Sequence, residues 1–113
     1  MIARARTVIF RASTLDDLRE FPLAARREVG HQIDQVQMGL NPDDWKPMST
    51  IGQGAREIRI RDDGGAFRVI YVAKFHDAIY VLHCFQKKTQ KTSKTDLDLA
   101  TRRYQDLVRE LGR

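Results

Sequence analysis

The sequence predicts one small α+β domain, residues 1–113, in which an antiparallel β-sheet packs against two N-terminal helices and a C-terminal helix. Three observations predict this fold class. Apolar residues recur at helical spacing near both ends of the chain, alternating segments occupy the middle, and an Asp-Gly pair joins two of those segments. A chain of 113 residues with 42% hydrophobic residues is sufficient for one core.

The first part of the chain is expected to form a short strand and two helices. Thr7–Phe10 is β-branched or aromatic, which suits an edge strand. Ser13 and Thr14 can cap a short helix, and Pro22 suits the first turn of a second one. Along the second helix, apolar residues spaced by three and four predict one buried face, made of Ala25, Val29, Ile33, Val36 and Leu40. Gly39 offers a place for this helix to stop.

The segment Asn41–Gly54 contains prolines and glycines and has no clear period. It is therefore interpreted as a long loop, with Trp45 and Ile51 as its anchors.

Three antiparallel strands are expected next, as a meander. Arg56–Arg61 alternates apolar and charged residues, which is the period of a half-buried strand. The sequence Asp62-Asp63-Gly64-Gly65 indicates a type I′ turn into a strand over Ala66–Phe75. A second tight connection at His76-Asp77 leads into a strand over Ala78–Phe85.

A C-terminal helix is expected after a basic segment. Ser93 and Asp96 match a capping box at its start. An apolar stripe at helical spacing follows, made of Leu97, Ala100, Tyr104, Leu107 and Leu111.

Charge and cysteine content limit the functional classes. The chain carries 20 Lys and Arg against 15 Asp and Glu, a net charge of +5, which favours an anionic partner, although an excess of charge also serves solubility. The single cysteine, Cys84, allows no intramolecular disulfide, so the cytoplasm is the expected location. Arg4, Arg6 and Arg11 leave no room for the apolar region of a signal peptide, and no apolar run is long enough to span a membrane.

Hairpin geometry predicts a cationic face on the sheet. If Asp63 and Gly64 form the loop, Arg59 lies directly opposite Arg68. If the loop were Gly64-Gly65 instead, Arg61 would face Arg68, but all three arginines would still share one face. Like charges across a sheet destabilise it, so this arrangement favours a ligand phosphate. The alternative is a set of solvated arginines on an exposed face, spaced by Glu57 and Asp62.

The same parity, continued across the second connection, places Ile70 opposite His83 and Arg68 opposite Phe85. His83 and Lys87 would then join the cationic face. The basic segment Gln86–Lys94 supplies further cations where a strand ends and a helix begins, namely Lys87, Lys88, Lys91 and Lys94.

Histidine and cysteine positions point away from metal chemistry. His83 is a secondary candidate for catalysis, with a structural hydrogen-bonding role as the alternative. His31 and His76 have no partner at metal-ligand spacing, so no metal is expected. No glycine-rich phosphate loop or hydrolase triad is evident, and no small-molecule cofactor is expected.

The order of elements and two motifs resemble a known family. "FRVIYVA" at Phe67–Ala73 and "YVLHCFQKKTQKT" at Tyr80–Thr92, followed by "LATRRYQDL" in the last helix, resemble the RelE/ParE superfamily of bacterial toxins, in particular its HigB-like, phage-derived branch. Members usually carry Pro and Glu just after the KKTxKT segment, where this chain has Ser93 and Asp96. The helix cap is kept.

The resemblance implies a small RelE-like fold and the toxin of a type II toxin–antitoxin system. Such a toxin cuts messenger RNA, commonly on the ribosome, without a metal, and a helix-turn-helix antitoxin silences it. The family's basic strand positions fall on Arg59 and Arg68, and its basic residue after the last strand falls on Lys87 or Lys88. Arg61, Lys91 and Lys94 are expected to bind RNA.

Two other functions stay open at this stage. A ParE-like inhibitor of DNA gyrase shares the fold, but that branch lacks the catalytic basic residues. A plain RNA-binding module is the third possibility, and it would need exposed aromatic side chains to stack bases. Its only candidates are Trp45, Tyr71, Phe75, Tyr80 and Phe85.

Overall fold

The computed structural model describes residues 5–112, so Arg4 and both ends of the predicted domain lie outside the described residues. The elements in chain order are β1 (Val8–Phe10), α1 (Thr14–Arg19), α2 (Leu23–Gln37), β2 (Trp45–Pro47), β3 (Ala55–Asp62), β4 (Gly65–Val72), β5 (Ile79–Lys87) and α3 (Lys94–Glu110). None of the helices in this range has the length and apolar character needed to cross a membrane.

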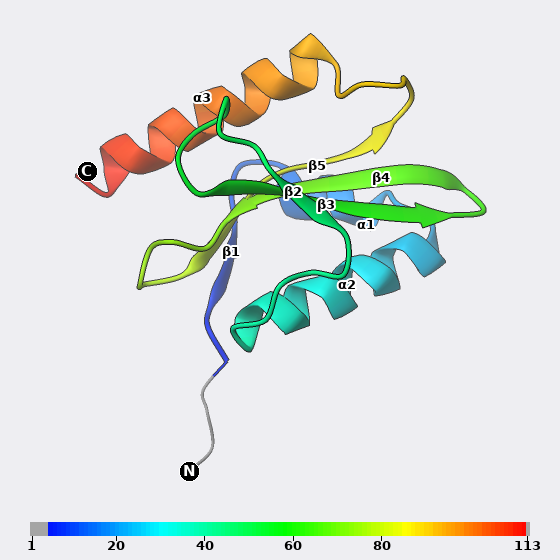
Figure 1. The fold of residues 1–113 in the computed structure, drawn as a ribbon, viewed down its shortest axis with the longest axis horizontal. Helices are drawn as coiled ribbons and strands as arrows, with labels where there is room; N and C mark the ends of the chain where they lie inside the picture. Colours follow the sequence, from blue (N-terminus) through cyan, green and yellow to red (C-terminus); the bar gives the residue numbers. More distant parts are fainter. Residues whose placement is uncertain (1–4, 113) are drawn as a thin grey trace.

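The five strands form one sheet in the order β1-β5-β4-β3-β2, with α2 on one face and α3 on the other (Figure 1). This arrangement confirms the predicted α+β class with two N-terminal helices and a C-terminal one. β3, β4 and β5 pair antiparallel, as expected, and β2 pairs antiparallel with β3. β1 differs, because this edge strand runs parallel to β5.

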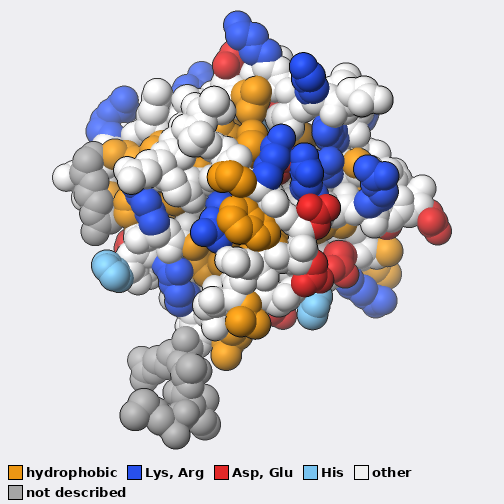
Figure 2. Space-filling view, in the orientation of Figure 1, with side chains coloured by type: hydrophobic (Ala, Val, Ile, Leu, Met, Phe, Trp, Pro, Cys, Tyr) orange, Lys and Arg blue, Asp and Glu red, His pale blue; other side chains and the backbone are white. Residues whose placement is uncertain are grey.

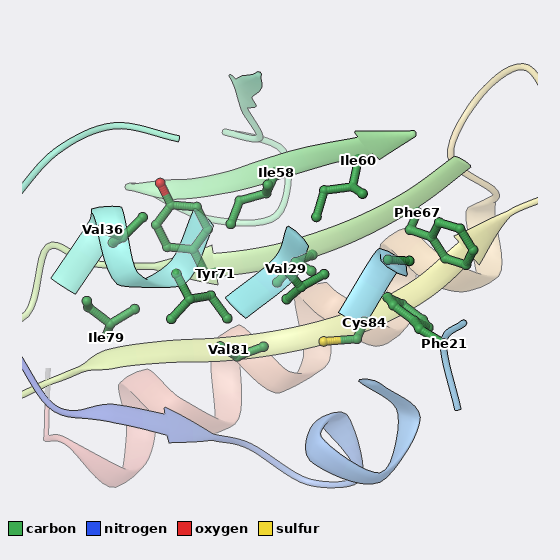
Figure 3. Close-up of a cluster of buried hydrophobic side chains, with 13 residues drawn as sticks. Phe21, Val29, Val36, Ile58, Ile60, Phe67, Tyr71, Ile79, Val81 and Cys84 are labelled. Carbon is green, nitrogen blue, oxygen red and sulfur yellow. The ribbon is translucent and has the colours of Figure 1, made fainter. Parts of the chain in front are cut away.

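Beneath α2, apolar side chains of the helix pack on the sheet (Figure 3). Ala25, Val29, Ile33 and Val36 are buried, as the helical spacing predicts. Leu40 was assigned to the same face, but it is 61% exposed. The helix ends at Gln37, and Gly39 follows with a positive φ of 84°, so Leu40 no longer keeps the helical register.

On the opposite face, α3 buries Ala100, Tyr104 and Leu107 against the sheet, with Leu97 and Leu111 partly buried beside them. The predicted N-cap at Ser93 is confirmed, because the Asp96 backbone N–H donates to Ser93 Oγ at 3.1 Å, while the second contact of the predicted capping box differs, since the Ser93 hydroxyl donates to the Asp96 carboxylate at 2.7 Å. At α1 the outcome differs. Ser13 occupies the N-cap, but its side chain accepts no backbone N–H there, and its hydroxyl donates to the Asp17 carboxylate.

The hairpin between β3 and β4 has the predicted loop but a different turn. Asp62 pairs with Gly65, so Asp63 and Gly64 are the loop residues. A type I′ turn needs positive φ at both of them, whereas the positive φ of 128° falls on Gly65. An Asp62 carboxylate oxygen accepts a bond from the Gly64 N–H at 2.7 Å and stabilises this alternative. The strand register, which depends on loop length, is as predicted.

The connection between β4 and β5 is longer than the two residues predicted, since it spans 73–78. A register shift in β5 compensates for the difference. Ile70 pairs with His83 while Tyr71 pairs with Val81, so Leu82 is an extra residue that forms a β-bulge. Beyond the bulge, the predicted pairings of Ile70 with His83 and of Arg68 with Phe85 are both present.

The segment predicted as a long loop contains the short edge strand β2. Trp45 pairs with Ile58 and Lys46 with Glu57. Ile51 is buried at 4% exposure and anchors the segment as predicted, while Trp45 is half-buried and stacks on the Arg56 guanidinium.

Candidate functional site

Two arginines face each other at the centre of the sheet. Arg59 of β3 pairs directly with Arg68 of β4, which confirms the predicted register. Arg61 pairs with Ala66, and Ala66 in turn pairs with Lys87 of β5. Alternation along the strands therefore places all four basic residues on the face that carries α3, near the end of the sheet that the hairpin closes.

The two arginines differ in exposure. The Arg59 side chain is 36% exposed, whereas that of Arg68 is 7% exposed and donates from Nη1 to the Phe67 carbonyl at 3.0 Å. Burial lowers the pKa of the Arg68 guanidinium, and the neighbouring charge of Arg59 acts in the same direction. The Glu57 carboxylate opposes that shift and is the charge that offsets the pair.

Glu57 lies beneath the arginines as a buried carboxylate with 1% side-chain exposure. Its Oε1 is 3.5 Å from Arg68 Nε and 3.7 Å from Arg59 Nε. Its Oε2 accepts a hydrogen bond from the Thr92 hydroxyl at 3.0 Å. Sequence reasoning treated Glu57 only as a spacer between basic residues. Its parity with Arg59 was the signal that placed it on the same face.

Lys87 ends β5 next to these groups. Burial lowers the pKa of its ammonium group, and the positive charge of Arg68 lowers it further, against the opposing effect of Glu57. Lys87 therefore loses its proton more readily than an ordinary lysine, which is the property a proton acceptor needs near neutral pH.

Three adjoining hollows surround this group. The largest, of about 440 Å³, lies between the 46–50 segment and the segment before α3, and it is lined by Lys46, Arg59, Lys87 and Lys91 among others. A second, of about 430 Å³, is lined by Arg61, Arg68, Lys87 and Lys88. A small third hollow lies between Asp44 and the arginines. Figure 2 shows Lys and Arg side chains gathered on this part of the surface.

The predicted RNA-binding residues differ in whether they line these hollows. Arg61 and Lys91 are exposed and line the hollows beside Arg68 and Arg59 respectively. Lys88 is exposed and lines the second hollow. Lys94 opens α3 and is exposed, but it lines none of these three hollows.

The structure does not bring His83 into this group. Its Nε2 lies 2.7 Å from Asp96 Oδ1, its ring stacks on Phe85 at 4.7 Å, and it lines a separate hollow together with Phe21 and Lys88. Burial lowers the pKa of His83, and the bond to Asp96 opposes that shift. These contacts tie the start of α3 to β5.

Other candidate side chains are accounted for by packing. Cys84 is buried, and desolvation raises the pKa of its thiol to about 12, so the thiolate is scarce at neutral pH. Within residues 5–112, no three His, Cys, Asp or Glu side chains cluster as metal ligands would. Of the aromatic residues considered for base stacking, Tyr71, Phe75, Tyr80 and Phe85 are buried.

A comparison with family models relates this chain to a family of phage-derived proteins. The model described as "Phage derived protein Gp49-like (DUF891)" matches residues 16–105, which include every residue of the basic group. No curated protein matches the chain.

Proposed function

Because the chain belongs to the Gp49-like family of phage-derived proteins, which is associated with RelE-like toxins, we propose that it is the toxin of a type II toxin–antitoxin system. Within that class, the proposed activity is a metal-independent endoribonuclease of the HigB-like branch that cuts messenger RNA on the ribosome and inhibits translation. Its proposed partners are messenger RNA, the ribosome and a cognate helix-turn-helix antitoxin, all in the cytoplasm.

One observation carries the proposal of RNA cleavage. Arg59 and Arg68 lie directly opposite each other, and Lys87 converges on them from the neighbouring strand. Facing cations lower the stability of a sheet, and the single negative charge of Glu57 offsets only part of the positive charge of Arg59, Arg68 and Lys87, so the group can still bind a further anion. A phosphate is the anion that guanidinium groups bind with two parallel hydrogen bonds.

The proposed reaction uses the RNA's own nucleophile. The ribose 2′-oxygen forms a bond to the adjacent phosphorus while its proton passes to a base on the protein. The bond from phosphorus to the 5′-oxygen breaks, and that oxygen takes up a proton. The products are a 2′,3′-cyclic phosphate and a free 5′-hydroxyl. Arg59 and Arg68 stabilise the negative charge that develops on the pentavalent phosphate.

Of the two candidate lysines, Lys87 is proposed as the proton acceptor. It lines both larger hollows beside the arginines, and its pKa is lowered by burial and by Arg68. Lys88 is fully on the surface, and its proposed role is to attract the RNA backbone together with Arg61, Lys91 and Lys94.

Induced expression in bacteria tests this function, with the 5′ ends of cellular messages mapped before and after induction. The wild-type chain is expected to arrest growth and to create new 5′-hydroxyl ends within coding regions. Arg68→Ala is expected to lose this activity by about 10² to 10³-fold, because a well-placed charge donor to the transition state is removed. Circular dichroism verifies that the variant is folded.

Two outcomes would contradict the proposal. Undiminished toxicity of a folded Arg68→Ala protein would remove the arginine pair from the mechanism. Growth arrest with intact transcripts and broken DNA would instead assign the chain to the gyrase-inhibiting branch.

A further inference from the structure

Glu57 is the only acidic side chain that is buried among the described residues, and it lies in the middle of the basic group. A buried carboxylate is costly unless charged or hydrogen-bonding partners surround it. On β3 it lies two residues before Arg59, and it pairs laterally with Lys46 of β2 and with Ile70 of β4. Packing alone would favour an apolar side chain at this position, as at Ile70 beside it.

The contacts of Glu57 are directed to one particular atom of each arginine. Its Oε1 lies between the Nε atoms of Arg68, at 3.5 Å, and Arg59, at 3.7 Å. Neither distance is that of a hydrogen bond, and these three buried atoms have no other hydrogen-bond partner in the structure described for residues 5–112. A small inward movement of the two guanidinium groups would satisfy all three atoms together.

This geometry leaves Nη N–H groups of both arginines for a ligand. When Nε–H faces the carboxylate, the remaining N–H groups of the planar guanidinium include ones directed away from it, although Arg68 Nη1 already donates one hydrogen bond to the Phe67 carbonyl. Arg59 is the more exposed of the pair and lines the hollow between the 46–50 segment and the segment before α3. Arg68 lines the hollow beside Lys87, and both arginines line the small hollow beside Asp44.

Glu57 also connects the arginines to the basic segment before α3. Its second oxygen accepts a hydrogen bond from Thr92, which belongs to the segment that carries Lys87, Lys88 and Lys91. One buried carboxylate therefore contacts two strands and the segment that forms the opposite wall of the largest hollow.

We propose that Glu57 is a positioning residue that holds the Nε–H groups of Arg59 and Arg68 inward, so that their Nη groups converge on one phosphate, and that ties the Lys87–Thr92 segment to this pair. The inference rests on the proposed ribonuclease function for its catalytic consequence. Its structural part concerns the two arginines and the Lys87–Thr92 segment and does not depend on RNA cleavage.

A charge-neutralising role and a positioning role for Glu57 predict different effects of Glu57→Gln on RNA cleavage. This substitution keeps the size of the side chain and removes one negative charge. If Glu57 only neutralised the arginines, the variant would bind RNA more tightly and cleave it at least as well. If Glu57 positions them, RNA binding is retained or tightened, whereas cleavage slows because the Nη groups lose their alignment.

Steady-state cleavage of a defined message on purified ribosomes separates these cases. Glu57→Gln is expected to lower kcat by about 10 to 100-fold with KM unchanged or lower. Glu57→Asp keeps the charge with a shorter reach and should recover part of the loss. Asp63→Asn, in the exposed hairpin loop, removes the same charge without touching the site and should match the wild type. A wild-type kcat in Glu57→Gln would overturn the proposal.

A second measurement needs neither catalysis nor a ribosome. In the ¹⁵N-labelled full chain, the Nε–H signals of Arg59 and Arg68 are followed by NMR while inorganic phosphate is added. Both signals should move together in the wild type, and in Glu57→Gln they should shift at the outset and exchange faster with water. Unchanged signals in Glu57→Gln would overturn the positioning role, even for a chain that cuts no RNA. An inactive wild type with coupled arginine signals would overturn only the nuclease assignment.

Thr92→Val provides the variant for the case in which Glu57→Gln does not fold. It keeps the shape of the side chain at a partly buried position and removes the hydroxyl that donates to Glu57. A several-fold fall in kcat is expected, with a change in both arginine signals. The absence of both effects would contradict the proposed link between Glu57 and the basic segment.

Discussion

At the scale of single residues, the site combines charges that differ greatly in their exposure to water. Arg68 is buried, Arg59 is about one-third exposed, and Lys88 is fully on the surface. Electrostatic forces are strongest where water is excluded, so of these residues the buried Arg68 is expected to have the largest effect on the proposed phosphate ligand. The surface lysines act mainly on the approach of a charged partner.

Lys87 and Lys88 are adjacent, and exchanging each for arginine distinguishes their roles. Lys87→Arg keeps the positive charge but removes an amine that can lose its proton, so cleavage should fall about 10² to 10⁴-fold, the usual range for a general base. Lys88→Arg serves as the matched control and should retain activity.

The pH dependence of cleavage follows from the lowered pKa of Lys87. A base acts in its neutral form, so the wild-type rate should rise with pH and level off above the pKa of Lys87. Because that pKa is lowered, the plateau begins below the pH expected for an ordinary lysine. Single-turnover rates across a pH series measure this profile. A wild-type rate that does not vary with pH would exclude Lys87 as the base.

The sequence predicts that Arg59, Arg61 and Arg68 share one face of the sheet, but not that Arg68 is buried. Two-residue periodicity and a two-residue loop determine the shared face, whereas the position of the loop decides whether Arg59 or Arg61 faces Arg68. Glu57 shares their parity, so its face was predictable as well. The burial of Glu57 depends on Thr92, which contacts it from the segment before α3. These two residues are far apart in the chain, so no local pattern predicts the contact.

At the scale of elements, local patterns predicted the long segments well and the short ones poorly. β2 has three residues and ends at Pro47, so it is too short for a period to be visible. The bulge at Leu82 also leaves no pattern, because apolar side chains occupy β5 on both faces. The predicted pairings of β5 with β4, Ile70 with His83 and Arg68 with Phe85, are nevertheless confirmed, because the longer connection and the bulge shift the strand register in opposite directions.

Substitution by alanine should change the free energy of unfolding in opposite directions at Gly52, in the segment between β2 and β3, and at Gly30, in α2. A Cβ on Gly52 would lie 2.3 Å from the Tyr104 ring, so Gly52→Ala should displace α3 and lower the free energy of unfolding by about 1 to 3 kcal/mol. Gly30 lies inside α2 with no atom within 4 Å of that position, so Gly30→Ala should raise it by about 0.5 to 1 kcal/mol. Urea unfolding of both variants measures the difference. Equal effects would show that α3 does not pack on Gly52 as described.

At the scale of the whole molecule, the distribution of charge matters more than the net charge of +5. Lys and Arg side chains gather on the face around the end of β3 and the segment before α3 (Figure 2). Such a face attracts a polyanion over the distance of a Debye length, about 8 Å at physiological salt.

Salt dependence reveals how many phosphates this face contacts. A single-stranded RNA that neutralises about four cations should show a slope near −3 in log affinity against log salt concentration, and a loss of about 50-fold between 50 and 200 mM. Fluorescence anisotropy with a 2′-O-methylated oligonucleotide, which has no nucleophile for cleavage, measures the slope. Arg61→Ala should reduce it by about 0.7. Arg102→Ala, on the exposed side of α3, should leave it unchanged. Equal slopes for Arg61→Ala and the wild type would place the RNA elsewhere.

The parallel pairing of β1 with β5 has a consequence for the order in which the protein is made. Val8 pairs with Ile79, so the strand synthesised first has no partner until β5 has been translated and has left the ribosome. The basic group also needs β5, because Lys87 completes it. In an unfinished chain, β1 is therefore unpaired and the basic group lacks Lys87. Both become complete late in synthesis, when the antitoxin proposed as the partner can already be present.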